Sequence, residues 1–326
     1  MDRESALIAH LTQLFPGPKQ GLGIGDDCAV IPIDSSTAWL FSTDALVDGT
    51  HFCTHTSTPE QLAYKVIMVN VSDIAAMGGT PHSVLLTLGL PTAFCDTWST
   101  RFLNALALVL KELTITLIGG DTVRSEKTLF INLTIIGTAS LAHIKYRHTA
   151  KKGDIIALSK ALGGSYAGLQ LLLKHWHSEG PDAESCRQQQ LMPHAQLAES
   201  QWLAQHPAVH AMMDLSDGLA ADLPKLCAAS GLSAELCVEK IPIDPAAANL
   251  ACANHLRPLD IAYVGGEDYA LLLTIAPENF ATIAAAYLTR FKQPLWPIGT
   301  LIEGESRLTL NGQRFEPQLA GFHHFD

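Results

Sequence analysis

The sequence predicts an α/β protein with two domains, and three observations support this. The chain has 326 residues, and domains usually run to about 100–200 residues. Short apolar runs with strand character alternate with longer segments of helical periodicity. A polar and basic stretch at residues 143–153 interrupts this alternation. We therefore expect one domain over residues 1–145 and a second over residues 146–326.

The first half opens with a predicted helix, in which Leu7, Ile8, Leu11 and Leu14 have helical spacing before Pro16. A loop over residues 16–25 should follow, and then strands at 28–33 and 38–42. A capping box around Thr58 and Pro59 predicts the start of a second helix, which Gly78 and Gly79 end. The remaining expected elements are a strand at 83–90, a helix at 97–112, a strand leading into Gly119-Gly120 and a strand at 128–139.

In the second half, the same alternation predicts strands at 154–159, 211–214, 233–238 and 269–275. Predicted helices follow Gly163-Gly164-Ser165 and occupy residues 217–230, 245–255 and 277–290. Residues 175–190 are polar, and we expect a loose connection there.

Composition excludes several classes of function. The net charge of −11 and the lack of a long run of consecutive Lys and Arg residues argue against nonspecific nucleic-acid binding. The longest apolar stretches, such as residues 84–90, are too short for a membrane span, and Asp2 and Glu4 do not fit a signal peptide. Seven cysteines without a C-x-x-C pair fit neither a disulfide framework nor a structural zinc site. The expected location is therefore the reducing cytoplasm.

A series of acidic clusters, each beside glycine or at a predicted element end, is the main functional signal. Carboxylates are hard oxygen ligands suited to Mg²⁺, and glycine lets backbone amides approach a phosphate closely. The clusters therefore predict a phosphoryl-transfer enzyme that works through several metal ions. They are GIGDD at 23–27, STD at 42–44, NVSD at 70–73, GGDT at 119–122, DLSDG at 214–218 and GGED at 265–268.

The helix that begins after Thr58 gives the clearest physical argument. Helical spacing places Asn70 and Asp73 on the same face as Leu62, Val66 and Met77. A buried, unpaired carboxylate is costly, so Asp73 needs either a metal or several hydrogen bonds. We expect metal ligation. A partly exposed face, or a capping role for Asp73, remains the alternative.

The other clusters have both a functional and a local structural interpretation. One of Asp26 and Asp27 should face the site, because neighbouring strand residues point in opposite directions. Asp44 follows a predicted strand end, where α/β sites form, but could simply stabilise a turn. Gly119-Gly120-Asp121-Thr122 also ends a predicted strand and could cradle phosphate or form a tight turn. Ser216 and Asp217 could cap a helix, whereas Asp214 at a strand end is harder to explain structurally.

Several common nucleotide and nucleophile motifs are absent from the sequence, including the P-loop, the kinase glycine-rich loop and the G-x-S-x-G elbow. Cys28 is expected to be a small packing residue rather than a nucleophile.

Taken in order, the motifs resemble those of the thiamine-monophosphate kinase family, in the superfamily of aminoimidazole ribonucleotide synthetase and selenophosphate synthetase. The matching strings are GIGDDCAVI at 23–31, STDALVDGTHF at 42–52, NVSDIAAMGGTP at 70–81, IGGDT at 118–122, DLSDGLAADL at 214–223 and GGEDYALLLT at 265–274. The resemblance implies a two-domain fold with a mixed N-terminal sheet that pairs in a homodimer, and a C-terminal α/β domain. It also implies transfer of the γ-phosphoryl group of ATP to thiamine phosphate, which needs no general base because the acceptor oxygen is already ionised.

The family's functional residues map onto this sequence position by position. The Mg²⁺ shell would comprise Asp27, Ser42, Thr43, Asp44, Asp73, Asp121, Asp214 and Asp217. ATP would contact Gly120, Asp121, Arg147 and Ser216, and thiamine phosphate would contact His51 and Glu267. Leu319 stands where an aromatic residue often stacks on thiamine, so Phe322 is the candidate substitute. The implied cofactors are several Mg²⁺ ions, with ATP as co-substrate, and a requirement for K⁺ stays open.

Two alternative functions stay open. A selenophosphate synthetase would need a reactive cysteine or selenocysteine near a lysine in the N-terminal loop, and residues 16–22 offer Lys19 but no cysteine. A noncatalytic protein that binds ATP and metal is the alternative from a different class. Retention of every acidic cluster argues against it, because a decayed site would tolerate their loss.

Overall fold

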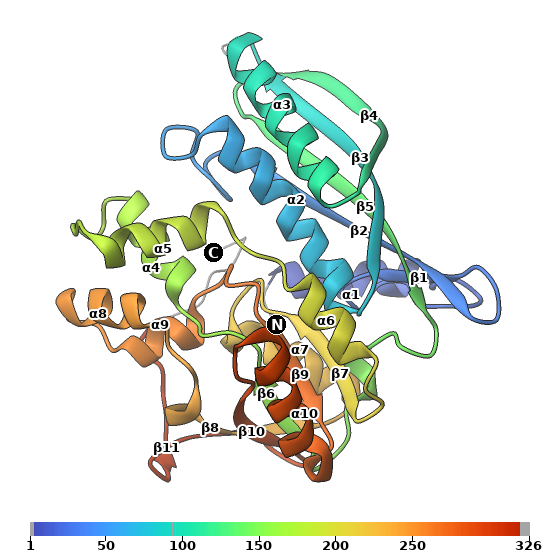
Figure 1. Cartoon of the computed structure of the whole chain (residues 1–326), viewed down its shortest axis with the longest axis vertical. Coiled ribbons are helices and arrows are strands. Elements are labelled where there is room, and N and C mark those ends of the chain that lie inside the picture. Colours follow the sequence, from blue (N-terminus) through green and yellow to red (C-terminus); the bar gives the residue numbers. More distant parts are fainter. Residues whose placement is uncertain (1–2, 93, 95, 320–326) are drawn as a thin grey trace.

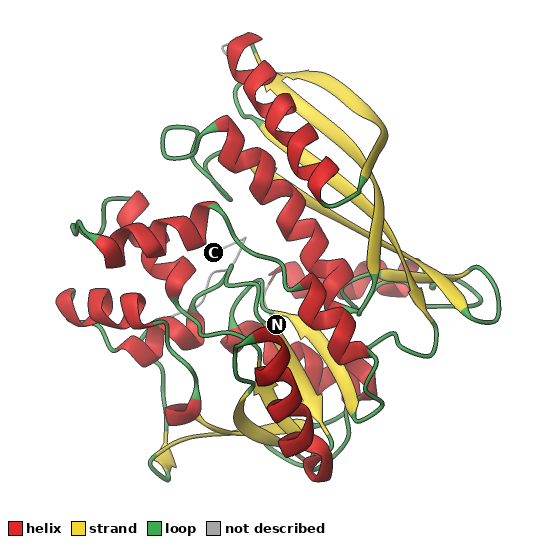
Figure 2. Ribbon diagram, viewed as in Figure 1, coloured by secondary structure: helices red, strands yellow, loops and turns green. Residues whose placement is uncertain are grey.

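The N-terminal half is a five-stranded mixed sheet with helices on one face (Figures 1 and 2). The computed structural model describes residues 3–92, 94 and 96–319. The strand order is β1 (Ala29–Pro32), β2 (Thr37–Val47), β5 (Phe130–Ser140), β3 (Thr80–Pro91) and β4 (Thr116–Ser125). Strands β3 and β4 are parallel and the other pairs are antiparallel, as expected for a mixed sheet. Helices α2 (Pro59–Ala76) and α3 (Asp96–Glu112) pack on the sheet.

The two faces of this sheet differ. Side chains such as Leu40, Val84 and Leu133 are buried on the face beneath the helices. The opposite face, which we call the open face, carries Trp39, Phe41 and Thr43 of β2, Thr134 of β5 and Leu85 of β3. These three strands are neighbours in the sheet. Trp39 and Leu85 are 38% and 37% exposed. Strand β4 lies at the sheet edge and is exposed along almost its whole length.

The C-terminal half contains a seven-stranded sheet with helices around it. Its strand order is β12 (Gln313–Arg314), β11 (Arg307–Leu310), β8 (Ser233–Cys237), β10 (Trp296–Ile302), β6 (Ile155–Leu158), β9 (Leu271–Ile275) and β7 (Val209–Asp214). The helices are α4 (Gly164–Leu172), α5 (Pro181–Leu191), α6 (Leu197–Ala204), α7 (Leu219–Ser230), α8 (Pro245–Ala253), α9 (Pro258–Val264) and α10 (Pro277–Phe291), with short 3₁₀ turns at Arg147–Thr149 and Val238–Lys240. None of the helices within the described residues could cross a bilayer.

Helix α2 links the two halves and begins as the sequence predicts. Thr58 accepts a hydrogen bond from the backbone of Gln61, and the Gln61 side chain returns one to the Thr58 backbone. This capping box satisfies two of the unpaired amide groups at the helix start. The helix packs against the first sheet and also contacts β7 and α6 of the second half. Because α2 touches both halves, the side chains on it can join residues from the two sheets.

The structure corrects three expectations about the elements. Residues 175–190 are not only a loose connection, because α5 starts at Pro181 after Gly180 and buries Ala183, Cys186 and Gln190 on one face. Strand β2 continues through Asp44 to Val47, and β4 runs through residues 119–122, so neither acidic cluster ends its strand. Helix α1 (Arg3–Leu14) forms as predicted, and its apolar residues Leu7, Ile8, Leu11 and Leu14 are exposed.

We predict that Thr58→Ala will destabilise the protein by about 1 kcal/mol, because it leaves an amide of the first turn of α2 unpaired. Urea unfolding followed by circular dichroism would measure the change. Thr58→Ser keeps the side-chain oxygen and should remain close to the wild type. Equal stability of all three proteins would contradict the role of the cap.

Candidate active site

Three carboxylates from separate segments meet in the interior. Asp27 lies just before β1, Asp73 lies on α2, and Asp214 ends β7. Each offers an oxygen, and these oxygens lie within 4.8 Å of one another. The Asp27 side chain is only 2% exposed, and Asp214 is buried. We call Asp27, Asp73 and Asp214 the carboxylate cluster.

The carboxylate cluster is electrostatically unfavourable without cations. Burial, reinforced by the neighbouring carboxylates, raises the pKa values of Asp73 and Asp214 well above their usual range. Burial also raises the pKa of Asp27 to about 6, against the lowering effect of Arg147. Ser42 donates to Asp73 and Ser72 donates to Asp214, but Asp27 Oδ2 has no hydrogen-bond partner among the described residues.

This arrangement fits divalent metal ions. A buried oxygen without a partner, beside other carboxylate oxygens, is costly unless a cation occupies the space between them. Hard oxygen donors of this kind match the preference of Mg²⁺. The carboxylate oxygens of Asp27, Asp73 and Asp214 are therefore suitable ligands for Mg²⁺, the metal that the sequence predicts.

Arg147 is the counter-ion that the structure places at one side of the cluster. Its guanidinium pairs with Asp27, and its Nε lies 3.6 Å from Asp26 Oδ1. The Arg147 backbone N–H also donates to Asp26 Oδ2 at 3.0 Å. Both aspartates therefore contact Arg147, whereas only Asp27 joins the carboxylate cluster.

Asp44 borders the cluster from β2. Burial and the nearby charges of Asp217 and Asp27 raise the pKa of Asp44 to about 6. The Asp44 backbone N–H donates to Asn70 Oδ1 at 3.2 Å, and the Asn70 amide donates to the Val66 carbonyl. Asn70 is fully buried, as its helical spacing predicts. It therefore fixes β2 against α2 beside Asp73.

Asp217 and Ser216 lie on the loop between β7 and α7. Lys225 Nζ lies 2.6 Å from Asp217 Oδ2 and 2.8 Å from Asp222 Oδ1. Asp222 accepts the Asp217 backbone N–H, and burial raises the pKa of Asp222 to about 6. The Asp217 side chain is partly exposed and is already paired with Lys225. Its surroundings therefore differ from those of the carboxylate cluster, which lies in the interior.

The structure does not bring Thr43, Gly120 and Asp121 to the cluster of the same chain. Thr43 points to the open face, where its hydroxyl lies 3.0 Å from that of Thr134. Asp121 lies on β4, which β5 and β3 separate from β2. Three strand spacings of about 4.8 Å place it about 14 Å across the sheet from Asp44. The backbone at Gly120 requires glycine, because an added Cβ would collide with the Leu86 carbonyl.

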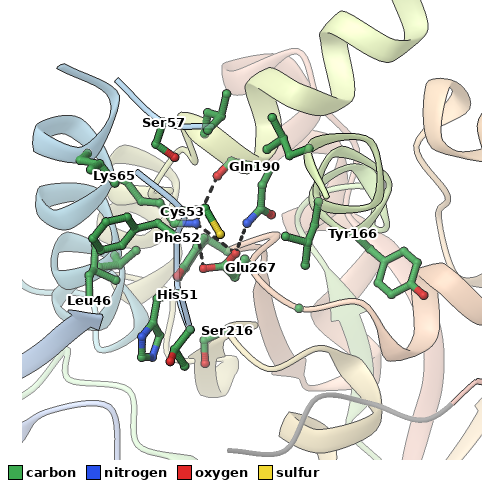
Figure 3. Close-up of a pocket in the computed structure, with 18 of the residues that line it drawn as sticks. Leu46, His51, Phe52, Cys53, Ser57, Lys65, Tyr166, Gln190, Ser216 and Glu267 are labelled. Carbon is green, nitrogen blue, oxygen red and sulfur yellow. Dashed lines mark hydrogen bonds and ion pairs between the residues drawn. The ribbon is translucent and has the colours of Figure 1, made fainter. Parts of the chain in front are cut away.

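A cavity of about 630 Å³ extends from the acidic residues between the two halves. Asp44, Asp73, Asp214 and Asp217 lie on its wall, and so do His51, Ser216 and Glu267. Figure 3 shows Lys65, Gln190 and Glu267 meeting in this pocket, with Tyr166 toward its edge. The rest of the pocket wall is apolar and is formed by Leu46, Phe52, Leu62, Val69, Leu169, Leu173, Leu191 and Val264. The pocket therefore joins an acidic end to an apolar chamber.

One stripe of α2 runs along the pocket wall. Leu62, Lys65, Val69 and Asp73 are spaced by three or four residues and all line the cavity. On the opposite wall, Glu267 has a positive φ of 61°, and its N–H donates to the Ser216 carbonyl at 2.7 Å. This hydrogen bond fixes the Glu267 backbone next to the loop that follows Asp214.

Local sequence signals do not mark two of the pocket residues, Lys65 and Gln190. Lys65 lies among apolar helix positions, and only its burial on the pocket side could have marked it. Gln190 lies in the segment that was expected to be a loose connection, although its burial on α5 follows from the i, i+3, i+7 spacing of that helix. Phe322 lies outside the described residues. Leu319 packs against the apolar clusters of the C-terminal half.

We predict that metal-free protein will lose stability as the pH rises from about 4 through about 6. A carboxyl with a higher pKa when folded holds its proton more tightly in the folded state, so its ionisation costs folding free energy. Above this range the penalty from Asp27 and Asp44 is fully present. Thermal unfolding in a chelator between about pH 5 and 7.5 would measure the loss.

The matched variant for this experiment is Asp73→Asn, which removes one of the repelling charges. It should be more stable than the wild type without metal at neutral pH, and its stability should depend less on pH. Added Mg²⁺ should then stabilise the wild type more than the variant. A less stable variant under metal-free neutral conditions would contradict the proposed repulsion.

Comparison with known proteins agrees with this architecture. Residues 25–139 match the family model of the AIR synthase related protein, N-terminal domain, and residues 151–311 match that of the C-terminal domain. These matches confirm the predicted fold class of two AIR-synthase-like domains.

Individual relatives cover most of the chain. Thiamine-monophosphate kinase of Haemophilus influenzae is 37% identical over 79% of this chain and 76% of the relative. Thiamine-monophosphate kinase of Escherichia coli is 34% identical over 93% of this chain and 92% of the relative. A solved structure of AaThiL complexed with AMPPCP and TMP is 30% identical, with a TM-score of 0.86, and covers 99% of this chain and 97% of that chain. The chain therefore belongs to the thiamine-monophosphate kinase family.

Proposed function

We propose that this protein transfers the γ-phosphoryl group of ATP to thiamine phosphate and forms thiamine diphosphate. The observation that carries the proposal is the pocket, which joins a buried acidic end to an apolar chamber large enough for a small organic molecule. Membership of the kinase family supports the reaction class. The similar AaThiL structure, complexed with AMPPCP and TMP, supports the two substrates.

The acidic residues would hold several Mg²⁺ ions. Asp27, Asp73 and Asp214 form one candidate set, and Asp44 and Asp217 extend it along the pocket wall. Ser42 already donates to Asp73, which would orient that carboxylate toward a metal. When bound, Mg²⁺ would neutralise phosphate oxygens and align the two substrates.

The residues of the site fit direct in-line transfer. A phosphate oxygen of thiamine phosphate is ionised near neutral pH, so the acceptor needs no general base. The site is correspondingly rich in carboxylates that can hold metal. Positioning and charge neutralisation would then supply the rate enhancement.

Arg147 and Ser216 would contact the nucleotide. Without ligands, Arg147 pairs with Asp26 and Asp27. Metal at Asp27 would compete for the same carboxylate, which would leave the guanidinium free to bind nucleotide phosphates. Ser216 lines the pocket beside Asp214 and Asp217.

The apolar chamber would hold the ring system of thiamine phosphate. His51 and Glu267 lie on its wall with Phe52 and Leu46 (Figure 3). The His51 ring accepts the Val47 backbone N–H at 3.1 Å, which orients the ring. The phosphate group of the substrate would then point to the acidic end.

The direct test is an incubation of purified protein with ATP, Mg²⁺ and thiamine phosphate, with thiamine diphosphate followed by chromatography. Parallel reactions use free thiamine or omit Mg²⁺. Metal-dependent product from thiamine phosphate alone is the expected result. ATP binding without any product would reject the kinase function.

We predict that Asp73→Asn will lower kcat/KM by at least about a hundredfold at limiting Mg²⁺, because it removes a metal ligand from the acidic end. The same chromatographic assay measures the loss. Asp34→Asn is the control, since Asp34 only stabilises an exposed turn. Unchanged turnover of Asp73→Asn would show that Asp73 does not hold a catalytic metal.

We also propose that the protein is a homodimer in which the open faces of two N-terminal sheets meet. Exposed Trp39 and Leu85, together with the exposed edge strand β4, provide an apolar surface for such contact. With the proposed domain boundary at residue 145, this surface lies entirely in the first domain. Pairing would also bring Asp121 of one chain to the site of the other, and this would account for its separation from the carboxylate cluster within one chain.

Mixing two inactive variants tests this arrangement. In a heterodimer of Asp73→Asn and Asp121→Asn, both changes fall in one site and the other site is intact. We predict recovery of about a quarter of wild-type activity after subunit exchange of an equal mixture. Asp121 acting within its own chain would leave both sites damaged, and no activity would return.

A further inference from the structure

We propose that Lys65 and Gln190 are positioning residues that hold the Glu267 carboxylate in a fixed orientation directed into the pocket. This inference rests on the proposed function and deepens it. Glu267 would then accept a hydrogen bond from the amino group of the substrate's pyrimidine ring. That amino group is the only N–H donor in thiamine phosphate, so a fixed acceptor would select for it.

The contacts around Glu267 form a closed network (Figure 3). Lys65 Nζ lies 3.0 Å from each carboxylate oxygen of Glu267 and 3.3 Å from the Gln190 carbonyl. The Gln190 side-chain amide donates to the same carboxylate. Ser165 donates to Gln190 Oε1, which fixes the amide so that its N–H₂ faces Glu267.

Burial shows which group the substrate can reach. The Lys65 side chain is 4% exposed, whereas the Glu267 side chain is 26% exposed. Gln190 is also buried. The cation and the amide therefore lie behind the carboxylate, and Glu267 presents the accessible surface. Lys65 and Gln190 would act on the substrate through Glu267.

The network also sets the charge of this end of the pocket. The opposite charges of Lys65 and Glu267 cancel, whereas the carboxylate cluster at the other end of the pocket consists of acidic groups only. Glu267 therefore offers hydrogen-bond acceptors without a competing site for metal. Removal of Lys65 would leave the Glu267 carboxylate without its cation, so the side chain would no longer be held toward the pocket.

A second buried lysine supplies a matched control. Lys145 is also almost fully buried, and its Nζ donates to the His206 carbonyl at 3.0 Å. Like Lys65, it joins the first half of the chain to the second. It is not among the residues that line the pocket. Loss of Lys145 therefore tests the general effect of removing a buried lysine between the halves.

The experiment compares Lys65→Met, Gln190→Leu and Lys145→Met by steady-state kinetics. For the first two, KM for thiamine phosphate should rise by at least about tenfold, while kcat and the KM for ATP change less than about threefold. Lys145→Met should leave the KM for thiamine phosphate near its wild-type value. Circular dichroism confirms folding, and Gln190→Leu keeps the test valid if Lys65→Met does not fold.

A double-mutant cycle separates positioning from a purely structural role. In the Glu267→Gln background, Lys65→Met should add little to the rise in KM, since the carboxylate that Lys65 orients is already gone. Additive effects, an equal rise in the KM for ATP, or the same change in Lys145→Met would overturn the inference. A wild type that makes no thiamine diphosphate would instead reject the proposed function itself.

Discussion

The mutual repulsion of Asp27, Asp73 and Asp214 is the constraint on which the site depends. Their oxygens lie within 4.8 Å of one another in the interior, and burial raises the pKa of each group. Such a cluster lowers the stability of the metal-free protein, so the rest of the fold must hold it together. Arg147, Ser42 and Ser72 reduce the repulsion only in part. Cations can remove the remainder, and this couples metal binding to stability.

Helix α2 carries one member of the carboxylate cluster and also reaches the part of the pocket that is proposed to bind the substrate. Its pocket stripe carries Asp73 at one end and Lys65 two turns earlier, about 12 Å away along the axis. One rigid helix thus sets the spacing between the carboxylate cluster and Glu267. The opposite wall comes from the loop that follows Asp214 and the loop that carries Glu267, and a backbone hydrogen bond between Ser216 and Glu267 holds these two loops together. The two ends of the pocket are therefore fixed relative to each other.

Local signals explain what the sequence could and could not predict. Helix α2 was predictable because its capping box and its polar interruptions at Asn70 and Asp73 depend only on residue type and helical spacing. Helix α5 was missed because most of its residues are polar, and its burial depends on packing against α4 and α8. Asp44 and Asp121 were expected at strand ends, since no local signal shows that β2 and β4 continue past them. The separation of Asp121 from the cluster depends on strand order, which a single sequence does not encode locally.

The most direct measurement is a crystal structure with Mn²⁺ in place of Mg²⁺ and a nonhydrolysable ATP analogue, with metal positions taken from anomalous scattering. We expect an anomalous peak within ligand distance of oxygens from Asp27, Asp73 and Asp214, with Arg147 turned toward the nucleotide. A cluster without metal, and with Arg147 still paired to Asp27 while the nucleotide is bound, would contradict the central role of these buried carboxylates.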